Sequence, residues 1–340
     1  MTVTFLDRPA KVRRARTTGT SRRRRAAVVV ATAAALAVPA AAAPAYAAPD
    51  LPPGGGQSRP VNQAAAPTVS AKGAFLMDSG TGATTMSKTA DTKRQMASTT
   101  KIATVRVVLG TSGLDLDRKV TIQQEYRDYV AREGASTADL RTGDQVTVRQ
   151  LLYATMLPSG CDAAYALADT FGTGSTRAAR VKSFIGKMNK LATDLGMTNT
   201  KFDSFDGIST AGDHYSTPRD LAKLARSSMQ YSTFRTVVKA KETVAKATAS
   251  NGNTRTYTWY NTNQLLGSYN GAVGIKTGTG TAAGPCLVFA ATRGDKTLVG
   301  VVLNGTDRYN DAAKMLDYGF GSSTADTMKL RKLPAEAQRD

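Results

Sequence analysis

The sequence predicts a mixed α/β fold of the α+β type, with one sheet built from both ends of the folded region around an inserted, mostly helical part. Near the start of this region, two short β-type runs flank Ser-Gly-Thr-Gly at residues 79–82, which is a hairpin signal. Near its end, residues 271–305 contain three strand-like runs, and a tight turn at residues 293–296 joins the last two. These five runs predict a sheet of about five strands.

The middle of the chain is predicted to be helical. The segment at residues 147–157 begins with Thr147 and has Gln150 three positions later, which is the pattern of a capping box. Its apolar residues then give this helix a broad apolar face. Pro218 stands at an allowed first-turn position of another predicted helix. That helix covers residues 217–229, and the other predicted helices cover residues 161–172, 176–196 and, after the last strand, 310–321.

The first 47 residues are predicted to be a secretory signal peptide. They carry nine Lys/Arg and one Asp, followed by an apolar, Ala-rich stretch that closes on Ala-Tyr-Ala at 45–47. This order is typical of export signals. A membrane anchor is the alternative, but Pro39 and Pro44 interrupt the stretch, which is weakly apolar for a membrane span. Residues 48–67, rich in Pro, Gly and Ala, are predicted to be a flexible linker. We therefore expect a secreted, extracytoplasmic protein.

Charge and composition narrow the class of partner. The formal net charge is +19, and removal of the leader's nine positive charges and one negative charge leaves +11. A basic protein can bind nucleic acid, but no basic stripe with interleaved aromatic residues occurs, so we expect no nucleic-acid partner. Anionic wall polymer or lipid headgroups suit an exported basic protein better, through a loose membrane or wall association. One His and two Cys are too few for a persuasive zinc site, although Cys161 and Cys286 could pair outside the cell.

Ser98 and Lys101 form the first candidate site. Ser98 is the only serine with a lysine three residues later, and positions i and i+3 share one face of a helix. In the simpler interpretation the serine caps a helix and the lysine is a surface residue of that helix. In the chemical interpretation Lys101 accepts the proton of the serine hydroxyl. A Ser-His-Asp triad would need His214, the only histidine, which we interpret as structural because the chain has no G-x-S-x-G motif.

A lysine that acts as a base needs help to lose its charge. A free lysine has a pKa of about 10.4, so half-neutralisation near pH 7 costs about 4.6 kcal/mol. A helix N-terminus supplies at most about 2 kcal/mol, so burial and a second positive charge must supply the rest. Lys276, in the unique Lys-Thr-Gly sequence at residues 276–278, is the candidate for that charge, and it offers a donor for a substrate carboxylate. Gly278 would let a substrate backbone approach.

A third segment, Pro-Ser-Gly-Cys at residues 158–161, joins two predicted helices. Taken alone, Ser159 is equally well explained as an N-cap serine. However, Ser-x-x-Lys, Ser-x-Cys and Lys-Thr-Gly occur here in the order of the three motifs of penicillin-binding proteins and serine β-lactamases. Residues 70–320 as a whole resemble the low-molecular-mass D-alanyl-D-alanine peptidases, the S11-type serine peptidases.

This resemblance implies a penicillin-binding protein/serine β-lactamase-like fold, in which an antiparallel sheet of about five strands is flanked by helices and an inserted, mostly helical subdomain. It implies a catalytic domain at residues 68–321 and a C-terminal tail at 322–340. Within the domain, the α/β part covers about 68–98 and 244–321, and the helical part covers about 99–243. We expect neither the β-rich C-terminal domain nor the membrane-binding helix of many members.

The resemblance also implies a role for each motif residue. Ser98 attacks the carbonyl between two D-alanines and is acylated, Lys101 accepts its proton, and Ser159 relays a proton towards the leaving amine. Lys276 helps to maintain the positive electrostatic potential of the site. Backbone N–H groups of Ser98 and Thr279 form the oxyanion hole, where one lost donor can cost roughly 10²–10³ in rate. The substrate-binding and oxyanion positions are Thr277, Gly278 and Thr279.

Cys161 departs from the usual pattern, in which the second motif ends in Asn. An amide offers an acceptor and two donors, whereas a thiol offers one weak donor. The Ser-Gly-Cys version resembles a smaller branch that includes a DD-transpeptidase, in which an amine rather than water receives the acyl group. We therefore favour transpeptidase over carboxypeptidase activity, with Cys161 as part of the site.

The implied substrate is a peptidoglycan stem peptide that ends in D-Ala-D-Ala, and β-lactam antibiotics are the implied inhibitors. No metal and no organic cofactor are implied, and a monomer is expected. Two alternatives remain. A serine β-lactamase shares the motifs, but the only Glu between the second and third motifs, Glu242, does not lie in the E-x-x-L-N pattern of class A enzymes. A non-catalytic wall-binding protein with degraded motifs would explain Cys161.

Overall fold

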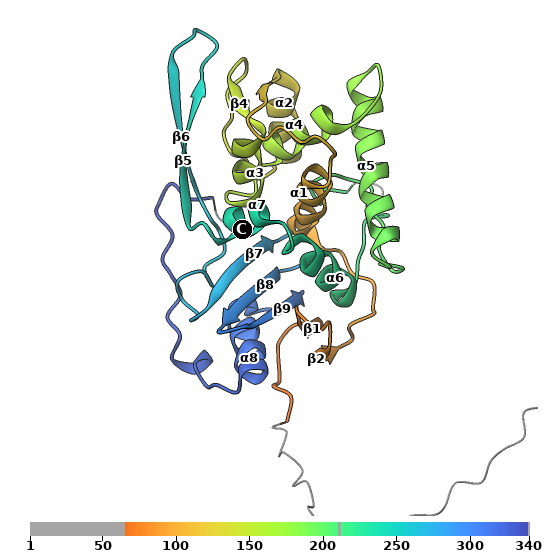
Figure 1. Cartoon of the computed structure of the whole chain (residues 1–340), viewed down its shortest axis with the longest axis vertical. Helices are drawn as coiled ribbons and strands as arrows, with labels where there is room; N and C mark the ends of the chain where they lie inside the picture. The colour runs from red at the N-terminus through yellow and green to blue at the C-terminus, as the bar shows by residue number, and fades with distance from the viewer. Residues whose placement is uncertain (1–64, 210–211, 339–340) are drawn as a thin grey trace, which may run out of the picture. The chain divides into compact units, whose positions relative to one another are not determined.

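The computed structural model describes residues 65–209 and 212–338, so the predicted signal peptide and most of the predicted linker lie outside the described residues. Its centre is a five-stranded antiparallel sheet with the strand order β2-β1-β9-β8-β7 (Figure 1). The N-terminal hairpin therefore pairs with the last strand of the chain, and the predicted fold class is confirmed. The strands are β1 (Gly73–Asp78), β2 (Thr84–Lys88), β7 (Ala272–Gly278), β8 (Cys286–Arg293) and β9 (Lys296–Leu303).

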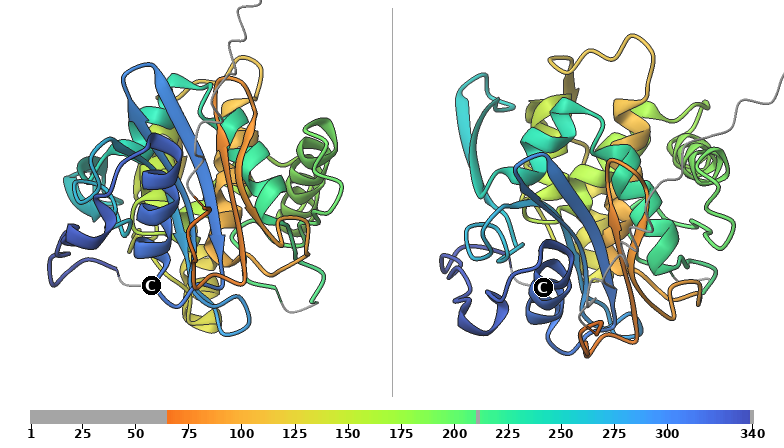
Figure 2. Two further views of the ribbon diagram at one scale, coloured as in Figure 1. Left: turned by 90° about the horizontal axis from the view of Figure 1, so that it is seen from below. Right: turned by 60° about the horizontal axis from the view of Figure 1, so that its bottom comes forward.

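Both faces of this sheet are buried, which explains the nearly continuous apolar runs of β8 and β9. Successive side chains of a strand point to opposite faces. On β9, Leu298 and Val302 pack in a core cluster with helix α8 (Arg308–Phe320), whereas Val299 and Val301 pack in the main core with helices of the middle region. Figure 2 shows α8 on one side of the sheet and the middle helices on the other.

The middle region is mostly helical, as predicted. Thr147 and Gln150 form the expected capping box, with Gln150 N donating to Thr147 Oγ1 at 3.1 Å and Thr147 N donating to Gln150 Oε1 at 2.8 Å. Pro218 occupies the first turn of its helix, as predicted. The helices before α8 are α1 (Lys101–Leu109), α2 (Gln124–Glu133), α3 (Val148–Met156), α4 (Cys161–Phe171), α5 (Arg177–Asp194), α6 (Pro218–Ser228) and α7 (Ser232–Lys239).

A second, four-stranded sheet was not predicted from the sequence. Its strand order is β3-β4-β5-β6, and the β5–β6 hairpin projects away from the five-stranded sheet (Figure 1). Strands β3 and β4 have three residues each, which is too short for a clear alternating pattern. The strands are β3 (Lys119–Thr121), β4 (Gln145–Thr147), β5 (Glu242–Thr248) and β6 (Thr254–Tyr260).

Two 3₁₀ turns complete the regular structure of the described residues. One, η1 (Ala97–Thr100), leads directly into α1. The other, η2 (Ala325–Thr327), lies in the segment that follows α8. Within residues 65–209 and 212–338, every helix is too short or too polar to cross a membrane.

Candidate active site

Ser98 lies in η1, directly before α1. Its side chain is half-buried, whereas Lys101 on the next turn is completely buried. The Nζ atom of Lys101 donates to Ser98 Oγ at 2.8 Å. The i, i+3 spacing in the sequence therefore places the amine and the hydroxyl in direct contact.

Two further oxygens surround the amine of Lys101. Ser159 Oγ lies 3.4 Å from Nζ, and the backbone carbonyl of Asp206 lies 3.2 Å away. No carboxylate oxygen forms an ion pair with Lys101 among the residues that the structure describes. Three oxygens, from Ser98, Ser159 and Asp206, therefore fix the position of the Lys101 amine beside the hydroxyl of Ser98.

Ser159 does not serve as the N-cap that the simpler interpretation gave it. The residue at the N-cap of α4 is Gly160, and no side chain caps this helix. Ser159 has a φ of 64°, in the left-handed region that non-glycine residues rarely adopt, and its hydroxyl is buried beside Lys101. Such a conformation persists only where the surrounding structure imposes it.

Cys161 begins α4 and is only 1% exposed. Its backbone N–H donates to Ser136 O at 2.8 Å, and its Sγ lies 3.9 Å from Ser159 O. Burial raises the pKa of the Cys161 thiol to about 12, and the carboxylate of Asp206 adds to this rise while Lys101 opposes it. The thiol is therefore neutral near pH 7 and acts as a weak donor rather than as a nucleophile.

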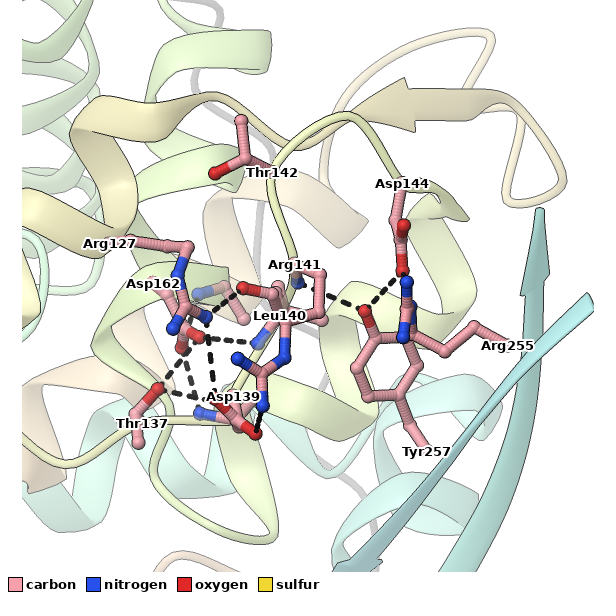
Figure 3. A network of polar contacts seen from close by, with 12 residues as sticks. Arg127, Thr137, Asp139, Leu140, Arg141, Thr142, Asp144, Asp162, Arg255 and Tyr257 are labelled. Atoms are coloured by element: carbon pink, nitrogen blue, oxygen red, sulfur yellow. Dashed lines mark hydrogen bonds and ion pairs between the residues drawn. The ribbon is translucent and has the colours of Figure 1, made fainter. Parts of the chain in front are cut away.

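The loop at residues 134–144 forms a network of polar contacts with Asp162, the residue that follows Cys161 at the start of α4 (Figure 3). The buried carboxylate of Asp162, next to Cys161, accepts from Ala138 N at 2.9 Å, Leu140 N at 3.0 Å and Thr137 Oγ1 at 2.9 Å. On the other side of the loop, Tyr257 OH donates to Asp144 Oδ2 at 2.6 Å. The network thus connects the start of α4 to strand β6 of the second sheet.

The third motif ends strand β7. Lys276 is buried, and its Nζ donates to Thr277 O at 3.1 Å. A Cβ atom on Gly278 would lie 3.0 Å from Ser98 N and 3.1 Å from Thr99 N. Gly278 is therefore needed so that β7 can pack against the backbone of η1, a reason that the sequence analysis did not give. This contact places the Lys-Thr-Gly strand beside the Ser98 segment.

Thr277 and Thr279 have different surroundings. Thr277 is buried, and its Oγ1 lies 2.6 Å from Thr262 Oγ1. Thr279 is exposed, and its Oγ1 accepts from the guanidinium of Arg308 on α8 at 2.9 Å. The same guanidinium donates to Gly278 O at 3.1 Å, so α8 fixes the end of β7.

Three residues near the site were missed in the sequence analysis: Thr262, Asp206 and Arg308. Asp206 is buried. Its carboxylate oxygen Oδ2 accepts from Tyr129 OH at 2.8 Å, and its backbone carbonyl accepts from Lys101 Nζ. Burial and the Asp206 carboxylate raise the pKa of Tyr129 well above its usual range, so Tyr129 remains a donor. A turn-type Asp-Gly pair at 206–207 was the only local signal.

Gly207 sets the position of the loop that carries Asp206. It has a φ of 100°, and a Cβ atom there would lie 2.0 Å from Ala97 O. The loop backbone therefore lies directly on the residue before Ser98. Ala97 itself has a φ of 46°, so the chain is held in a left-handed conformation at this contact.

His214 is structural, as the sequence analysis expected, and does not contact Ser98. Its Nε2 lies 2.7 Å from Thr100 Oγ1, and its Nδ1 accepts from Asp203 N at 3.1 Å. Burial lowers the pKa of His214, so the ring is neutral. Cys161 and Cys286 are both free and buried. Among the described residues, no group of three or more His, Cys, Asp or Glu side chains could hold a metal ion.

The sequence matches the peptidase S11 family, described as D-alanyl-D-alanine carboxypeptidase, over residues 60–307. A D-alanyl-D-alanine carboxypeptidase from Streptomyces strain K15 is 59% identical over 265 residues, which are 77% of this chain and 91% of that relative. The D-alanyl-D-alanine carboxypeptidase DacC of Escherichia coli is 38% identical over 270 residues, which are 75% of this chain and 62% of that relative.

Solved structures of similar proteins match the fold of this chain. The crystal structure of the Streptomyces K15 DD-transpeptidase is 61% identical in sequence and matches 75% of this chain and 98% of that chain, with a TM-score of 0.74. A penicillin-binding protein homologue from Mycobacterium tuberculosis is 28% identical and matches 78% of this chain and 96% of that chain, with a TM-score of 0.66. The family match covers all three sequence motifs.

Proposed function

Since the chain belongs to the peptidase S11 family of D-alanyl-D-alanine carboxypeptidases, we propose that Ser98 is the nucleophile of a serine DD-peptidase that acts outside the cytoplasmic membrane. The family predicted from the three motifs is confirmed. The contact of 2.8 Å between Lys101 Nζ and Ser98 Oγ is the observation that carries the assignment of the nucleophile. The substrate is a peptidoglycan stem peptide that ends in D-Ala-D-Ala.

In the acylation step, Ser98 Oγ attacks the carbonyl carbon of the penultimate D-alanine while its proton passes to the neutral amine of Lys101. The C–N bond to the terminal D-alanine then breaks. The leaving amine takes up a proton from Ser159 Oγ, which regains one from Lys101 across the 3.4 Å contact. The products are an ester on Ser98 and free D-alanine, and the Lys101 amine is neutral again.

Backbone N–H groups of Ser98 and Thr279 stabilise the oxyanion in this proposal. The contact between Gly278 and the N–H groups of η1 supports it, because β7 approaches Ser98 closely enough to place both donors on one side of the carbonyl. Lys276 is buried at the same strand end and adds positive charge. That charge attracts the substrate carboxylate.

We further propose that the acyl group passes to an amine in preference to water. The neutral thiol of Cys161 supports this preference, because it is a poorer hydrogen-bond partner for an attacking water than an amide would be. The same ester is formed with penicillin, and slow attack by water then leaves a lasting adduct.

Mass spectrometry of the intact protein after penicillin treatment tests the proposal. One adduct on Ser98 is expected, with none in Ser98→Ala and a normal adduct in Ser87→Ala, which removes an exposed serine on β2. An unmodified wild-type protein would support the non-catalytic alternative, and rapid penicillin turnover would support the β-lactamase alternative. Incubation of a D-Ala-D-Ala peptide with and without an added amine then separates the two acceptors, since amide products indicate transfer and free acid indicates hydrolysis.

A further inference from the structure

Thr262 lies between two motifs of the active site. Its backbone N–H donates to Leu157 O at 3.1 Å, two residues before Ser159. Its hydroxyl lies 2.6 Å from the hydroxyl of Thr277 in the Lys-Thr-Gly strand. Thr262 is 3% exposed, so both contacts are shielded from water. A shift of Thr262 would therefore move the second and third motifs relative to each other.

The backbone on both sides of Thr262 is held by one side chain from the C-terminal tail. The guanidinium of Arg331 donates to Asn261 O at 2.6 Å and to Asn263 O at 3.3 Å through Nη2, and to Leu266 O at 3.2 Å through Nε. The Arg331 backbone is fixed as well, because its N–H donates to Ser268 Oγ at 2.7 Å. Arg331 thus joins the tail to the turn at residues 261–263.

The Arg331 guanidinium binds backbone groups rather than a carboxylate. All three acceptors are backbone carbonyls, and Arg331 forms no ion pair with a carboxylate among the described residues. Burial lowers the pKa of Arg331, as expected for a cation that is partly removed from water. The planar fork of a guanidinium suits several carbonyls of one turn, which a lysine could not reach together.

Arg331 also lies outside residues 60–307, which are the residues that match the S11 family. It follows α8 and the 3₁₀ turn η2. The turn that touches two catalytic motifs is therefore held by a residue that the family match does not include.

We propose that Arg331 is a positioning residue for acylation, and that the C-terminal tail sets the spacing of Ser159 and Thr277 through Thr262. The inference rests on the proposed function of Ser98. Without the guanidinium, three carbonyls lose their donor and the 261–263 turn can relax. Misplacement of catalytic groups by about 1 Å can cost about 10²-fold in rate. Because Thr262 keeps its contact with Leu157, we expect a smaller loss, of about tenfold.

The variants Arg331→Met and Arg331→Lys test the proposal, with Lys332→Met as the matched control. Lys332 is the exposed neighbour, so the control removes the same charge from the same segment. The second-order rate of acylation by benzylpenicillin should fall about tenfold in Arg331→Met, fall less in Arg331→Lys, and stay within about twofold of wild type in Lys332→Met. With a D-Ala-D-Ala peptide, kcat should fall more than KM rises, because substrate contacts are retained.

Chemical rescue distinguishes positioning from a general loss of stability. A hollow of about 570 Å³, lined by Arg331, Lys332, Lys241, Glu242, Tyr260 and Pro334, opens beside the guanidinium. Millimolar methylguanidinium should therefore restore part of the acylation rate of Arg331→Ala, and should not change the rate of wild type or of Lys332→Met. A merely destabilised variant would gain nothing from so dilute an additive.

Thr262→Val supplies a second line of evidence that does not depend on the folding of the Arg331 variants. It should show the same acylation defect, and the double variant Thr262→Val/Arg331→Met should be no slower than the slower single variant, because both act on one contact. Acylation of Arg331→Met or Thr262→Val at the wild-type rate would overturn the inference while leaving the proposed function intact. A wild-type protein without a penicillin adduct would instead overturn the proposed function.

Discussion

The protonation state of Cys161 decides which chemistry the thiol can contribute to the site. A neutral thiol is a weak hydrogen-bond donor, whereas a thiolate would be a second nucleophile beside Ser159. The structure favours the neutral thiol, because the side chain is 1% exposed and its pKa is raised to about 12. Alkylation by iodoacetamide measures this directly, since the thiolate is the reactive form.

The expected rate follows from two opposing effects. At about pH 7.5, a thiol with the reference pKa of 9.0 is about 3% ionised, whereas a pKa of about 12 leaves about 0.003% ionised, so the thiolate is about a thousandfold scarcer. A more basic thiolate is the better nucleophile, by about 20-fold for a Brønsted coefficient of about 0.45. Cys161 should therefore react at least about 50-fold more slowly than an exposed thiol, and burial slows access further.

The assay uses Cys286→Ala, in which Cys161 is the only cysteine. Intact-mass analysis follows alkylation over time, with glutathione as the exposed reference thiol, and each sample is then treated with benzylpenicillin. The alkylated fraction should gain no penicillin adduct, because the added group occupies space beside Ser159 and Lys101. Alkylation as fast as that of glutathione would refute the neutral thiol, and full acylation of the alkylated protein would refute the place of Cys161 in the site.

Two further predictions concern groups that support the site. Gly207→Ala should lower the acylation rate by about 10²-fold or more, because the new Cβ atom would lie 2.0 Å from Ala97 O. Gly196→Ala is the control, because Gly196 also has a positive φ but a Cβ atom there would meet no atom within 4 Å. Equal acylation rates in the two variants would contradict the reasoning. For His214, burial lowers the pKa below the ordinary 6.5, so its stabilisation is complete above about pH 6.5 and is lost as the pH falls below it. Melting temperatures at about pH 7.5 and 5.5 should therefore differ less in His214→Gln than in wild type, and an equal difference would argue against a neutral buried ring.

The five-stranded sheet could be predicted because each of its strands carries its own signal. β8 and β9 are buried on both faces and read as apolar runs, and the two-residue turn between them contains Gly294. The second sheet lacks such signals. Each of β3 and β4 buries a single residue, Val120 or Val146, and β5 joins them through the pair Gln145 and Thr248. That pairing is non-local, and no local pattern reports it.

The same distinction applies to the site. Ser98 and Lys101 are three residues apart, so their spacing alone predicted that the two side chains would be in contact. Asp206 reaches Lys101 with a backbone carbonyl, a group that every residue has and that no sequence pattern marks. Thr262 and Arg331 contact the motifs from distant parts of the chain. Sequence motifs therefore pointed to the residues that we propose to react, while the groups that fix their spacing required the fold.

The position of Ser98 is set by backbone packing on two sides. The loop at Gly207 lies on the carbonyl of Ala97, and β7 at Gly278 lies on the N–H groups of Ser98 and Thr99. A Cβ atom would lie 2.0 Å from Ala97 O at Gly207 and 3.0 Å from Ser98 N at Gly278, so the first contact excludes a side chain and the second leaves little room for one. Because neither depends on the residue at position 161, an amide there can be exchanged for a thiol without displacing the nucleophile. The exchange then changes the hydrogen bonds offered to the acyl acceptor and leaves the geometry of acylation as it was, which is why we expect Cys161 to influence the fate of the acyl-enzyme more than its formation.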